Sequence, residues 1–277
     1  MCRVLGVKRS AYYHYQRHRA NRPEDPEHTE MLEWVKNIAQ ASDNSYGTRR
    51  MQKALNALSY PVSRHKARRL MKEANIEVRY KKKYKTTTNS KHKQPVFDNL
   101  VKRQFDVEQA NQVYASDITY IWTQEGWLYL AVVIDLFSRR VVGWSMNSRM
   151  KTQLVCDALR MAIWQRQPEA GLIHHSDRGS QYASKAFRRL LEIHSLKGSM
   201  SRKGDCWDNA VVESFFGSLK QERVHWRNYQ TRYEAQQDIL NYITMFYNSQ
   251  RLHSYLGYTS PSQYEKDRLE LNLKEAA

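Results

Sequence analysis

Three carboxylates, Asp117, Asp177 and Glu213, stand where they could hold divalent metal ions together. Asp117 lies in an alternating segment, Asp177 ends the stretch Leu172-Ile-His-His-Ser-Asp177, and Glu213 lies among apolar residues spaced as in a helix. Hard divalent cations take oxygen ligands, and two-metal phosphodiester chemistry needs carboxylates that converge from different elements. We therefore expect these residues to be the metal ligands and catalytic groups of a nucleic-acid enzyme that uses two Mg²⁺ ions, for which Mn²⁺ could substitute.

Two basic residues accompany these carboxylates. Lys220 follows Glu213 by seven residues and therefore shares its helical face, so we expect its ammonium group to point to bound substrate. The ordinary alternative is a solvated lysine on a surface helix. Arg178 directly follows Asp177 and opens the stretch Arg178-Gly-Ser180. Small residues and an arginine in such a loop could admit DNA.

Positive charge exceeds negative charge in this chain, mainly near its beginning. Its 277 residues include 45 Lys+Arg and 28 Asp+Glu, for a formal net charge of +17. Residues 1–100 hold 22 Lys+Arg and 9 Asp+Glu, whereas residues 101–277 hold 23 and 19. Such an excess is typical of proteins that bind a polyanion, either nucleic acid or an anionic membrane. We expect the first third to bind the polyanion and the rest to form a catalytic body.

Hydropathy and cysteine usage argue against a membrane protein. The sequence has no run of eighteen apolar residues, its mean hydropathy is −0.80, and no signal-peptide pattern follows Met1. Its cysteines, Cys2, Cys156 and Cys206, are odd in number and lack metal-ligand spacing. This usage is typical of reduced thiols in a cytosolic protein, so we expect a cytoplasmic location.

Short helices are predicted for the first third of the chain. Apolar residues at helical spacing predict helices over residues 4–15, 30–41 and 48–58. Ser63 can cap a further helix that runs to about Ala74. The last two helices resemble a helix-turn-helix unit, because a few turn residues around Pro61 separate them. The helix after Ser63 carries its cations largely on one face, as either a DNA-binding surface or an ordinary solvated one. The candidate DNA contacts in this region are Arg49, Arg50, Arg64, Arg68, Arg69 and Lys72.

The segment after this region has no helical or strand period. From Arg79 to Lys93 it is basic and poor in large aliphatic residues, so Lys81, Lys82 and Lys83 could follow a phosphate backbone by charge alone. We therefore divide the chain into a helical DNA-binding region (1–78), a basic linker (79–110), a catalytic core (111–225) and a C-terminal helical extension (226–277).

Within the core the pattern predicts an α/β fold. Strands are expected over residues 114–122, 127–137, 141–146, 172–175 and 196–200, and helices over residues 152–166, 184–194 and from Asp208 or Asn209 onward. This order predicts a mixed five-stranded sheet flanked by helices, with an antiparallel meander at its start. Asp117 would lie on the first strand and Asp177 just past the fourth, and neighbouring strands would bring the two carboxylates together.

Other acidic and imidazole groups near the motifs have simpler interpretations. Asp135 closes a strand, where a turn or cap role is expected, and Asp208 is expected to cap a helix. His174 and His175 precede Asp177. Imidazole suits zinc better than magnesium, and alternation on a strand would direct only one of the two rings toward the Asp177 side.

At this point the sequence resembles a known family. The order Asp, Asp, thirty-five intervening residues, Glu, and a lysine seven positions later resembles the DDE transposases and retroviral integrases of the RNase H-like superfamily. The resemblance is closer to the OrfB proteins of the bacterial insertion-sequence-three family and covers nearly the whole chain. The stretches that carry it are Ser116–Ile121, Val133–Arg139, His174–Tyr182, Ser201–Ala210, Tyr247–Arg251 and, in the helix-turn-helix region, Gly47–Met51.

That resemblance implies an RNase H-like core and a function in DNA transposition, by Mg²⁺-dependent cleavage at the element's 3′ ends followed by strand transfer. It also implies a homo-oligomer on DNA, and an upstream OrfA frame whose product is fused to this chain by frameshifting. Two other classes remain open. A related nuclease would share the carboxylates but only hydrolyse DNA, and a DNA-binding regulator would have lost the chemistry.

Overall fold

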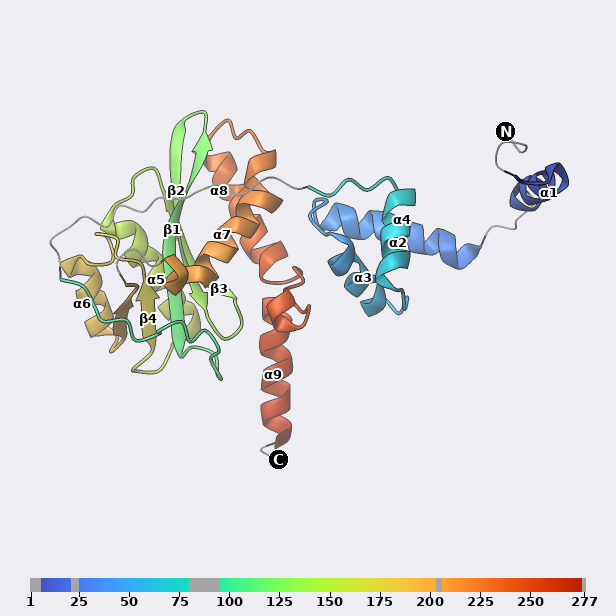
Figure 1. The fold of residues 1–277 in the computed structure, drawn as a ribbon. Helices are drawn as coiled ribbons and strands as arrows, with labels where there is room; N and C mark the ends of the chain where they lie inside the picture. The colour runs from blue at the N-terminus through green and yellow to red at the C-terminus, as the bar shows by residue number, and fades with distance from the viewer. Residues whose placement is uncertain (1–5, 21–24, 80–94, 203–205, 276–277) are drawn as a thin grey trace. The chain divides into compact units, whose positions relative to one another are not determined.

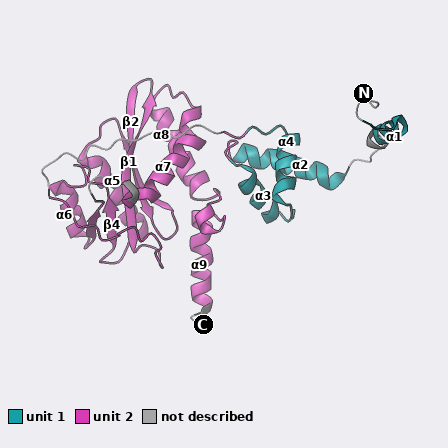
Figure 2. Cartoon of the chain, in the orientation of Figure 1, with its two compact units in different colours: residues 1–41, 46–77 teal, residues 42–45, 78–277 magenta. Residues whose placement is uncertain are grey.

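The computed structural model describes residues 6–20, 25–79, 95–202 and 206–275. Figures 1 and 2 show the chain and its division into two compact units. We call residues 1–41 and 46–77 the helical unit, and residues 42–45 and 78–277 the sheet unit. The basic residues Lys81, Lys82 and Lys83 lie outside the described residues. Among the described residues, no helix is both long and apolar enough to cross a membrane.

The helical unit packs three of its helices around a small apolar core. Met31, Val35, Met51, Leu55 and Leu70 lie at the centre of this core. The cap predicted from the sequence is present, since the Ser63 hydroxyl accepts a hydrogen bond from the Lys66 backbone N–H at 3.1 Å. In chain order the helices of this unit are α1 (Arg9–Ala20), α2 (Pro26–Ala41), α3 (Thr48–Ala57) and α4 (Arg64–Glu73).

The first helix was predicted in the wrong place. The apolar spacing predicted it over residues 4–15, but α1 begins at Arg9 and continues to Ala20. Gly6 has a φ of +65°, in the left-handed region that an α-helix does not use, so a helix cannot run through it. The next helix, α2, starts four residues earlier than predicted, at Pro26, because the fixed φ of proline suits the first helical position.

A mixed sheet forms the centre of the sheet unit. Its strand order is β3-β2-β1-β4-β5, with antiparallel pairing of β1 with β2 and of β2 with β3, and parallel pairing of β1 with β4 and of β4 with β5. The predicted five-stranded sheet with an initial meander is therefore confirmed. The strands are β1 (Val113–Thr123), β2 (Gly126–Asp135), β3 (Val141–Asn147), β4 (Ile173–Ser176) and β5 (Lys197–Met200).

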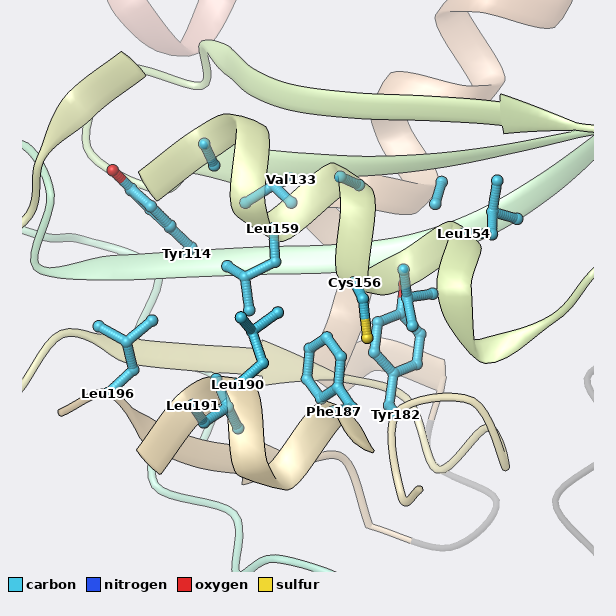
Figure 3. Packing of buried hydrophobic residues seen from close by; sticks show 14 of the residues in the cluster. Tyr114, Val133, Leu154, Cys156, Leu159, Tyr182, Phe187, Leu190, Leu191 and Leu196 are labelled. Carbon is cyan, nitrogen blue, oxygen red and sulfur yellow. The ribbon is translucent and has the colours of Figure 1, made fainter. Parts of the chain in front are cut away.

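Helices α5 and α6 cover one face of this sheet. Figure 3 shows Leu159 and Phe187 from these two helices in the same apolar cluster as Val133 of β2. The close approach of α5 requires a glycine in β3, since a Cβ at Gly143 would lie 2.2 Å from the Ala158 carbonyl oxygen. The helices of the sheet unit are α5 (Thr152–Arg166), α6 (Lys185–Ile193), α7 (Ala210–Glu222), α8 (Arg232–Asn241) and α9 (Pro261–Glu275).

A buried ion pair joins the C-terminal extension to α7. Arg251 Nη2 lies 2.6 Å from Glu222 Oε1, and Tyr242 donates its hydroxyl to the other oxygen of Glu222 at 2.7 Å. Three residues before Arg251, the side-chain amide of Asn248 exchanges two hydrogen bonds with the backbone of Val141 in β3. The stretch Tyr247–Arg251 therefore fixes the extension to both α7 and the edge of the sheet.

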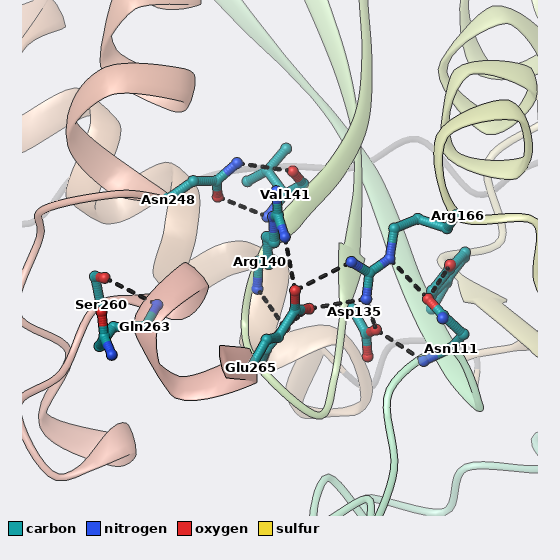
Figure 4. Close-up of polar contacts among 11 residues, drawn as sticks. Asn111, Asp135, Arg140, Val141, Arg166, Asn248, Ser260, Gln263 and Glu265 are labelled. Carbon is teal, nitrogen blue, oxygen red and sulfur yellow. Dashed lines mark hydrogen bonds and ion pairs between the residues drawn. The ribbon is translucent and has the colours of Figure 1, made fainter. Parts of the chain in front are cut away.

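A second polar cluster holds α9 against the turn after β2 (Figure 4). Glu265 accepts hydrogen bonds from Arg140 at 2.7 Å and from Arg166 at 2.9 and 3.0 Å. Asp135, fully buried beside Arg166, accepts the backbone N–H groups of Asn111 and Phe137, as its predicted turn role requires. Burial is the main cause that raises the pKa of Asp135 to about 6.

Residues 97–100, which we call the β5 strap, pack along the outermost strand. The Met200 N–H donates to the Asp98 carbonyl at 3.3 Å, and the Leu100 N–H donates to the Ser199 hydroxyl at 2.9 Å. The Phe97 ring fills the space beside Gly198, where a Cβ would approach within 2.6 Å of it. Part of the segment expected to be a linker thus covers the edge of the sheet.

Candidate active site

Asp117 and Asp177 lie at the same end of the paired strands β1 and β4. Ser116 of β1 stands beside Ser176 of β4 in a parallel register; Asp117 is the next residue of β1, and Asp177 directly follows the last residue of β4. Asp117 Oδ1 accepts the N–H of Ile118 at 2.7 Å. The predicted convergence of these two carboxylates follows from this pairing, because β1 and β4 are neighbours.

The loop after Asp177 is built around Gly179. The Gly179 N–H donates to Asp177 Oδ1 at 2.9 Å, and a Cβ at this position would lie 2.9 Å from that oxygen. Any larger residue would therefore displace the carboxylate. The same Cβ would lie 3.6 Å from the ring of Tyr182, so the loop also sets this tyrosine beside Asp177. Arg178, a predicted DNA contact, donates its Nε to the Ser201 carbonyl at 2.7 Å.

Glu213 lies in the first turn of α7, which is tied to β1 next to Asp117. The Asn209 side chain, just before the helix, donates to the Ser116 carbonyl at 3.1 Å. Val212, Phe215 and Leu219 bury one face of α7, while the side chain of Glu213 is exposed. A carboxylate in the first turn is also favoured by the partial positive charge at a helix N-terminus.

The three carboxylates and Lys220 interact through their charges. Burial raises the pKa of Asp117 well above its usual range, and the negative charges of Asp177 and Glu213 raise it further. The positive charge of Lys220 and the Ile118 N–H oppose this rise. Burial in turn lowers the pKa of Lys220, and the charge of Asp117 offsets part of this effect. The sequence elements that were expected to supply ligands thus meet around Asp117.

The oxygen atoms of the three carboxylates suit a hard cation, although the side chains are not close enough together to coordinate one jointly. Among the described residues, no three His, Cys, Asp or Glu side chains are close enough to hold a metal ion as they stand. Like charges repel without a cation between them, so some separation is expected. All three groups offer oxygen, which Mg²⁺ prefers.

Two buried polar atoms beside the carboxylates are orphaned. The Tyr182 side chain is 1% exposed, and its hydroxyl has no hydrogen-bond partner among the described residues. The Asn209 Oδ1 atom is likewise buried without a partner there. Water bound to a cation could pair with both, so the surroundings fit a hydrated metal ion. Sequence reasoning considered Asn209 only as a possible start of the helix and did not single out Tyr182, although each lies inside a stretch that resembles the family, His174–Tyr182 and Ser201–Ala210.

The two histidines before Asp177 are hydrogen-bonded within the core. His174 Nε2 lies 2.8 Å from the Ser116 hydroxyl, and His175 Nδ1 lies 2.9 Å from the Ser199 hydroxyl. Both rings are buried. Burial lowers the pKa of His174 to about 3 and that of His175 to about 4, so both are neutral near pH 7.

The cap role predicted for Asp208 is wrong. Its carboxylate is fully buried and accepts hydrogen bonds from the side chains of Asn99 at 2.8 Å and Arg103 at 3.1 Å, and from the Arg202 N–H at 2.9 Å. Asp208 therefore links the residues around the β5 strap to the start of α7. Asn99 and Arg103 lie about a hundred residues earlier in the chain, so helical spacing gave no signal for these two partners.

The DNA-binding residues predicted in the helical unit lie on α3 and α4. Arg64, Arg68, Arg69 and Lys72 are all exposed on α4, and Ala67, Leu70 and Met71 are buried on its other side. On α3, Arg49 is exposed and Arg50 lies over the ring of Tyr46 at 5.7 Å. The cations of α4 thus form one charged surface of a helix-turn-helix-like unit.

Family comparisons cover most of the chain. Residues 107–206 and 213–269 each match a family described as an integrase core domain, and residues 27–84 match an HTH-like domain. The chain is 43% identical to a 31 kDa protein of insertion element IS600 from Shigella sonnei, over 96% of this chain and 97% of that protein. It is 42% identical to the transposase InsF of insertion sequence IS3A from Escherichia coli, over 97% of this chain and 94% of that protein.

Solved integrase structures also match the chain. One is the simian T-cell lymphotropic virus intasome, with 16% identity and a TM-score of 0.49 over 77% of this chain and 70% of that one. Another is the catalytic core of HTLV-2 integrase in complex with magnesium, with 17% identity and a TM-score of 0.43 over 56% and 96%. Because its relatives match over nearly their full length and its domains match as well, the chain belongs to the IS3 family of transposases, DDE enzymes of DNA transposition that combine an HTH-like region with an integrase core.

Proposed function

We propose that Asp117, Asp177 and Glu213 hold two Mg²⁺ ions and that the sheet unit uses this site to cleave the 3′ ends of a mobile element and join them to another DNA strand. The observation that supports this most directly is the parallel register of β1 and β4, which brings Asp117 and Asp177 to one end of the strand pair. The charge of Glu213 acts on Asp117 from α7. Bound metal would activate the attacking oxygen and stabilise the leaving oxygen.

Both steps are exchanges at phosphorus and need no covalent intermediate on the protein. In the first, a water oxygen bonds to the scissile phosphorus and the 3′ oxygen of the element leaves as a 3′ hydroxyl. In the second, that hydroxyl oxygen bonds to phosphorus in another strand and displaces its 3′ oxygen. Lys220 would neutralise a phosphate beside the carboxylates, and the small residues around Gly179 would leave room for the strand.

The remaining parts of the proposal concern DNA binding and assembly. The exposed cations of α4 would bind DNA ends through their phosphates, with Arg49 and Arg50 on α3, Arg178 in the sheet unit, and Lys81, Lys82 and Lys83 in the basic segment as further contacts. The transposase would act as a homo-oligomer on DNA, alone or fused to an upstream OrfA product.

Isosteric variants of the three carboxylates test the proposed site. Asp117→Asn, Asp177→Asn and Glu213→Gln keep the shape of each side chain, and each is expected to lower cleavage and joining of an element-end oligonucleotide by about a hundredfold or more in Mg²⁺ or Mn²⁺. DNA binding without metal should change little, because most of the excess positive charge lies in residues 1–100.

The matched control is Asp157→Asn on α5, an exposed aspartate paired with Arg160 at 3.0 Å, which should keep normal activity. Near-normal strand transfer by any of the three variants would remove that residue from the proposed site. Product analysis separates joining from hydrolysis, so a related enzyme that only cuts DNA would be recognised by the absence of joined strands.

A further inference from the structure

One face of the β1–β2 hairpin carries four aromatic side chains. Tyr120 stands opposite Tyr129, and Trp122 opposite Trp127, in the antiparallel register. Directly opposed residues share a face of the sheet, as do residues two apart on one strand, so all four lie together. The Tyr120 and Trp127 rings are 5.0 Å apart and the Trp122 and Trp127 rings 4.8 Å apart, both edge to face. We call these four residues the aromatic face.

The outer part of this face is not covered by the part of the sheet unit that the structure describes. On the opposite face of the hairpin, Leu128 and Leu130 are fully buried, and α8 packs against β1 and β2. On the aromatic face, Ala131 and Val133 of β2 pack in the α5 cluster, but Trp127 is 43% exposed and Trp122 is 53% exposed. Clustered exposed aromatic residues, unlike single ones, are typical of binding surfaces.

The hairpin that carries the aromatic face is firmly held. Arg232 at the start of α8 donates its Nε to the Trp127 carbonyl at 3.1 Å, and its backbone N–H donates to Glu125 at 2.9 Å. The Gln124 N–H donates to the Tyr229 carbonyl at 3.0 Å. The rings are therefore presented by a fixed hairpin, which reduces the entropy lost when a ligand stacks on them.

A lysine connects the aromatic face to the catalytic carboxylates. The Lys220 ammonium lies 5.0 Å from the centre of the Tyr120 ring, within the range of a cation–π contact. Its charge also acts on Asp117, which precedes Tyr120 by three residues on β1. At about 3.3 Å per residue, Tyr120 and Trp122 lie about 10 and 17 Å along the strand from Asp117. Because Asp117 and Tyr120 are three residues apart, their side chains leave opposite faces of β1, and Lys220 interacts with both at the edge of β1 beyond Ser116, where the pairing with β4 ends.

We propose that the aromatic face binds unpaired bases of the DNA strand whose scissile phosphate lies at the carboxylates, while Lys220 contacts the phosphates between them. The proposal rests on the function proposed above. A single strand offers phosphates for the ammonium group of Lys220 and flat bases for the exposed indole rings. Stacking of bases on aromatic side chains is a common mode of single-strand binding. With about 3.4 Å per nucleotide, the bases concerned lie about three to five nucleotides from the scissile phosphate.

The binding preference of the full chain for unpaired ends tests this inference. Affinity is measured by anisotropy without metal, so that no cleavage occurs, for a labelled duplex that is blunt or carries a five-nucleotide single-stranded extension. The wild type is expected to bind the extended duplex about tenfold more tightly or better. The double variant Trp122→Ala/Trp127→Ala should lose this preference and keep its affinity for the blunt duplex. Trp122→Phe/Trp127→Phe retains aromatic rings at both positions and should keep most of the preference. This variant keeps the inference testable if the alanine variant fails to fold.

Trp164→Ala provides the matched control, since Trp164 is a single tryptophan of α5 that is 79% exposed. This variant should behave as the wild type. The inference is overturned if the wild type shows no preference for the extension, or if the double alanine variant keeps it. A change in oligomeric state of that variant with the preference intact would assign the face to a subunit contact instead. If the wild type performs strand transfer but shows no preference for the extension, this inference fails and the proposed function stands. If the wild type shows the preference but performs no strand transfer, the proposed function fails by itself.

Discussion

In the helical unit the cations of α4 project from one side of the helix into solvent, whereas the sheet unit buries its principal charges against defined partners. Arg64, Arg68 and Lys72 are exposed along α4. By contrast, Glu222 and Asp208 are buried, and each accepts hydrogen bonds from several named donors.

This contrast separates two uses of charge. Exposed cations on a helix can each neutralise a phosphate, so their effects on DNA affinity should add, and salt should weaken them. A buried charge depends on its particular partner, because removing that partner leaves an uncompensated ion in the protein interior. Substitutions should therefore have graded effects in the helical unit and large, specific effects in the sheet unit.

The largest effect is expected from Arg251→Ala, which leaves Glu222 buried without its cation. We expect the free energy of unfolding to fall by about 3–5 kcal/mol, with a clear drop in the melting temperature of the full chain. The matched control is Arg160→Ala, which breaks the exposed pair with Asp157 and should change the free energy by no more than about 0.5 kcal/mol.

A double variant sharpens this test. Arg251→Met/Glu222→Met removes both charges and should recover much of the lost stability, because the penalty comes from the unpaired ion rather than from the missing pair. Equal melting temperatures for Arg251→Ala and Arg160→Ala would contradict the special role of buried partners.

Lys220→Ala tests a cation that shares features of both classes of charge. Lys220 is half-buried, like the paired charges of the sheet unit, but it lies near the proposed DNA path, like the cations of α4. Removing a charge-assisted interaction worth about 1.5–3 kcal/mol should lower end cleavage by an order of magnitude or more. The melting temperature should stay within about 2 °C, as is usual for surface substitutions. Lys185→Ala, an exposed lysine of α6, is the control. Normal cleavage by Lys220→Ala, or a clearly lowered melting temperature of this variant, would show that Lys220 has a structural role instead.

Neutralising the α4 cations should have a smaller, additive effect. For each phosphate that Arg64, Arg68, Arg69 or Lys72 no longer neutralises, the slope of log K against log salt should fall in magnitude by about 0.9. DNA affinity of the single and quadruple glutamine variants, measured across a salt series, checks this. An unchanged slope in the quadruple variant would show that α4 presents an ordinary solvated face.

The smallest effect concerns pH and the sheet unit alone. His174 and His175 have folded pKa values lowered to about 3 and 4, below the ordinary value of 6.5, so the unfolded chain binds more protons as the pH falls through 6.5. Their contribution to stability is therefore present above pH 6.5 and lost below it, by about 1 kcal/mol for the pair between pH 7 and pH 6.

Hydrogen exchange can resolve this loss by unit. Amide protection in the sheet unit should fall over that pH window after correction for intrinsic exchange rates, and His174→Gln/His175→Gln should flatten the dependence. The comparison with this double variant isolates the histidines, because the raised pKa values of Asp135, about 6, and of Asp117 act in the opposite direction as the pH falls. The same pH dependence in the wild type and the double variant between pH 7 and pH 6 would contradict the prediction.

Local patterns in the sequence predicted much of this molecule. Alternation predicted β1 through Asp117, and helical spacing predicted α7 through Glu213, because burial of one face leaves a regular trace in the sequence. The pairing of β1 with β4 was also expected, since a mixed sheet of this strand order makes them neighbours. β1 and α7 contain Asp117 and Glu213, and Asp177 directly follows β4.

Contacts between distant segments could not be predicted in this way. Two side-chain donors of Asp208, Asn99 and Arg103, lie more than a hundred residues away, and Arg251 reaches Glu222 from a separate extension. The orphaned hydroxyl of Tyr182 is visible only once its neighbours are placed. Periodicity records which face of an element is buried but carries no information on which polar group will meet another there.

The β5 strap has a consequence for any attempt to express the sheet unit as a fragment. A fragment cut at residue 111, where the repetitive pattern of the core begins, would lack the Phe97 ring beside Gly198 and the Leu100 N–H that donates to the Ser199 hydroxyl. It would also lack the Asn99 and Arg103 side chains that donate to Asp208. The outer edge of β5 would then be open to pairing with another copy, a common route to aggregation. A fragment that starts at residue 95 keeps its own edge protection and should remain the better behaved of the two in solution.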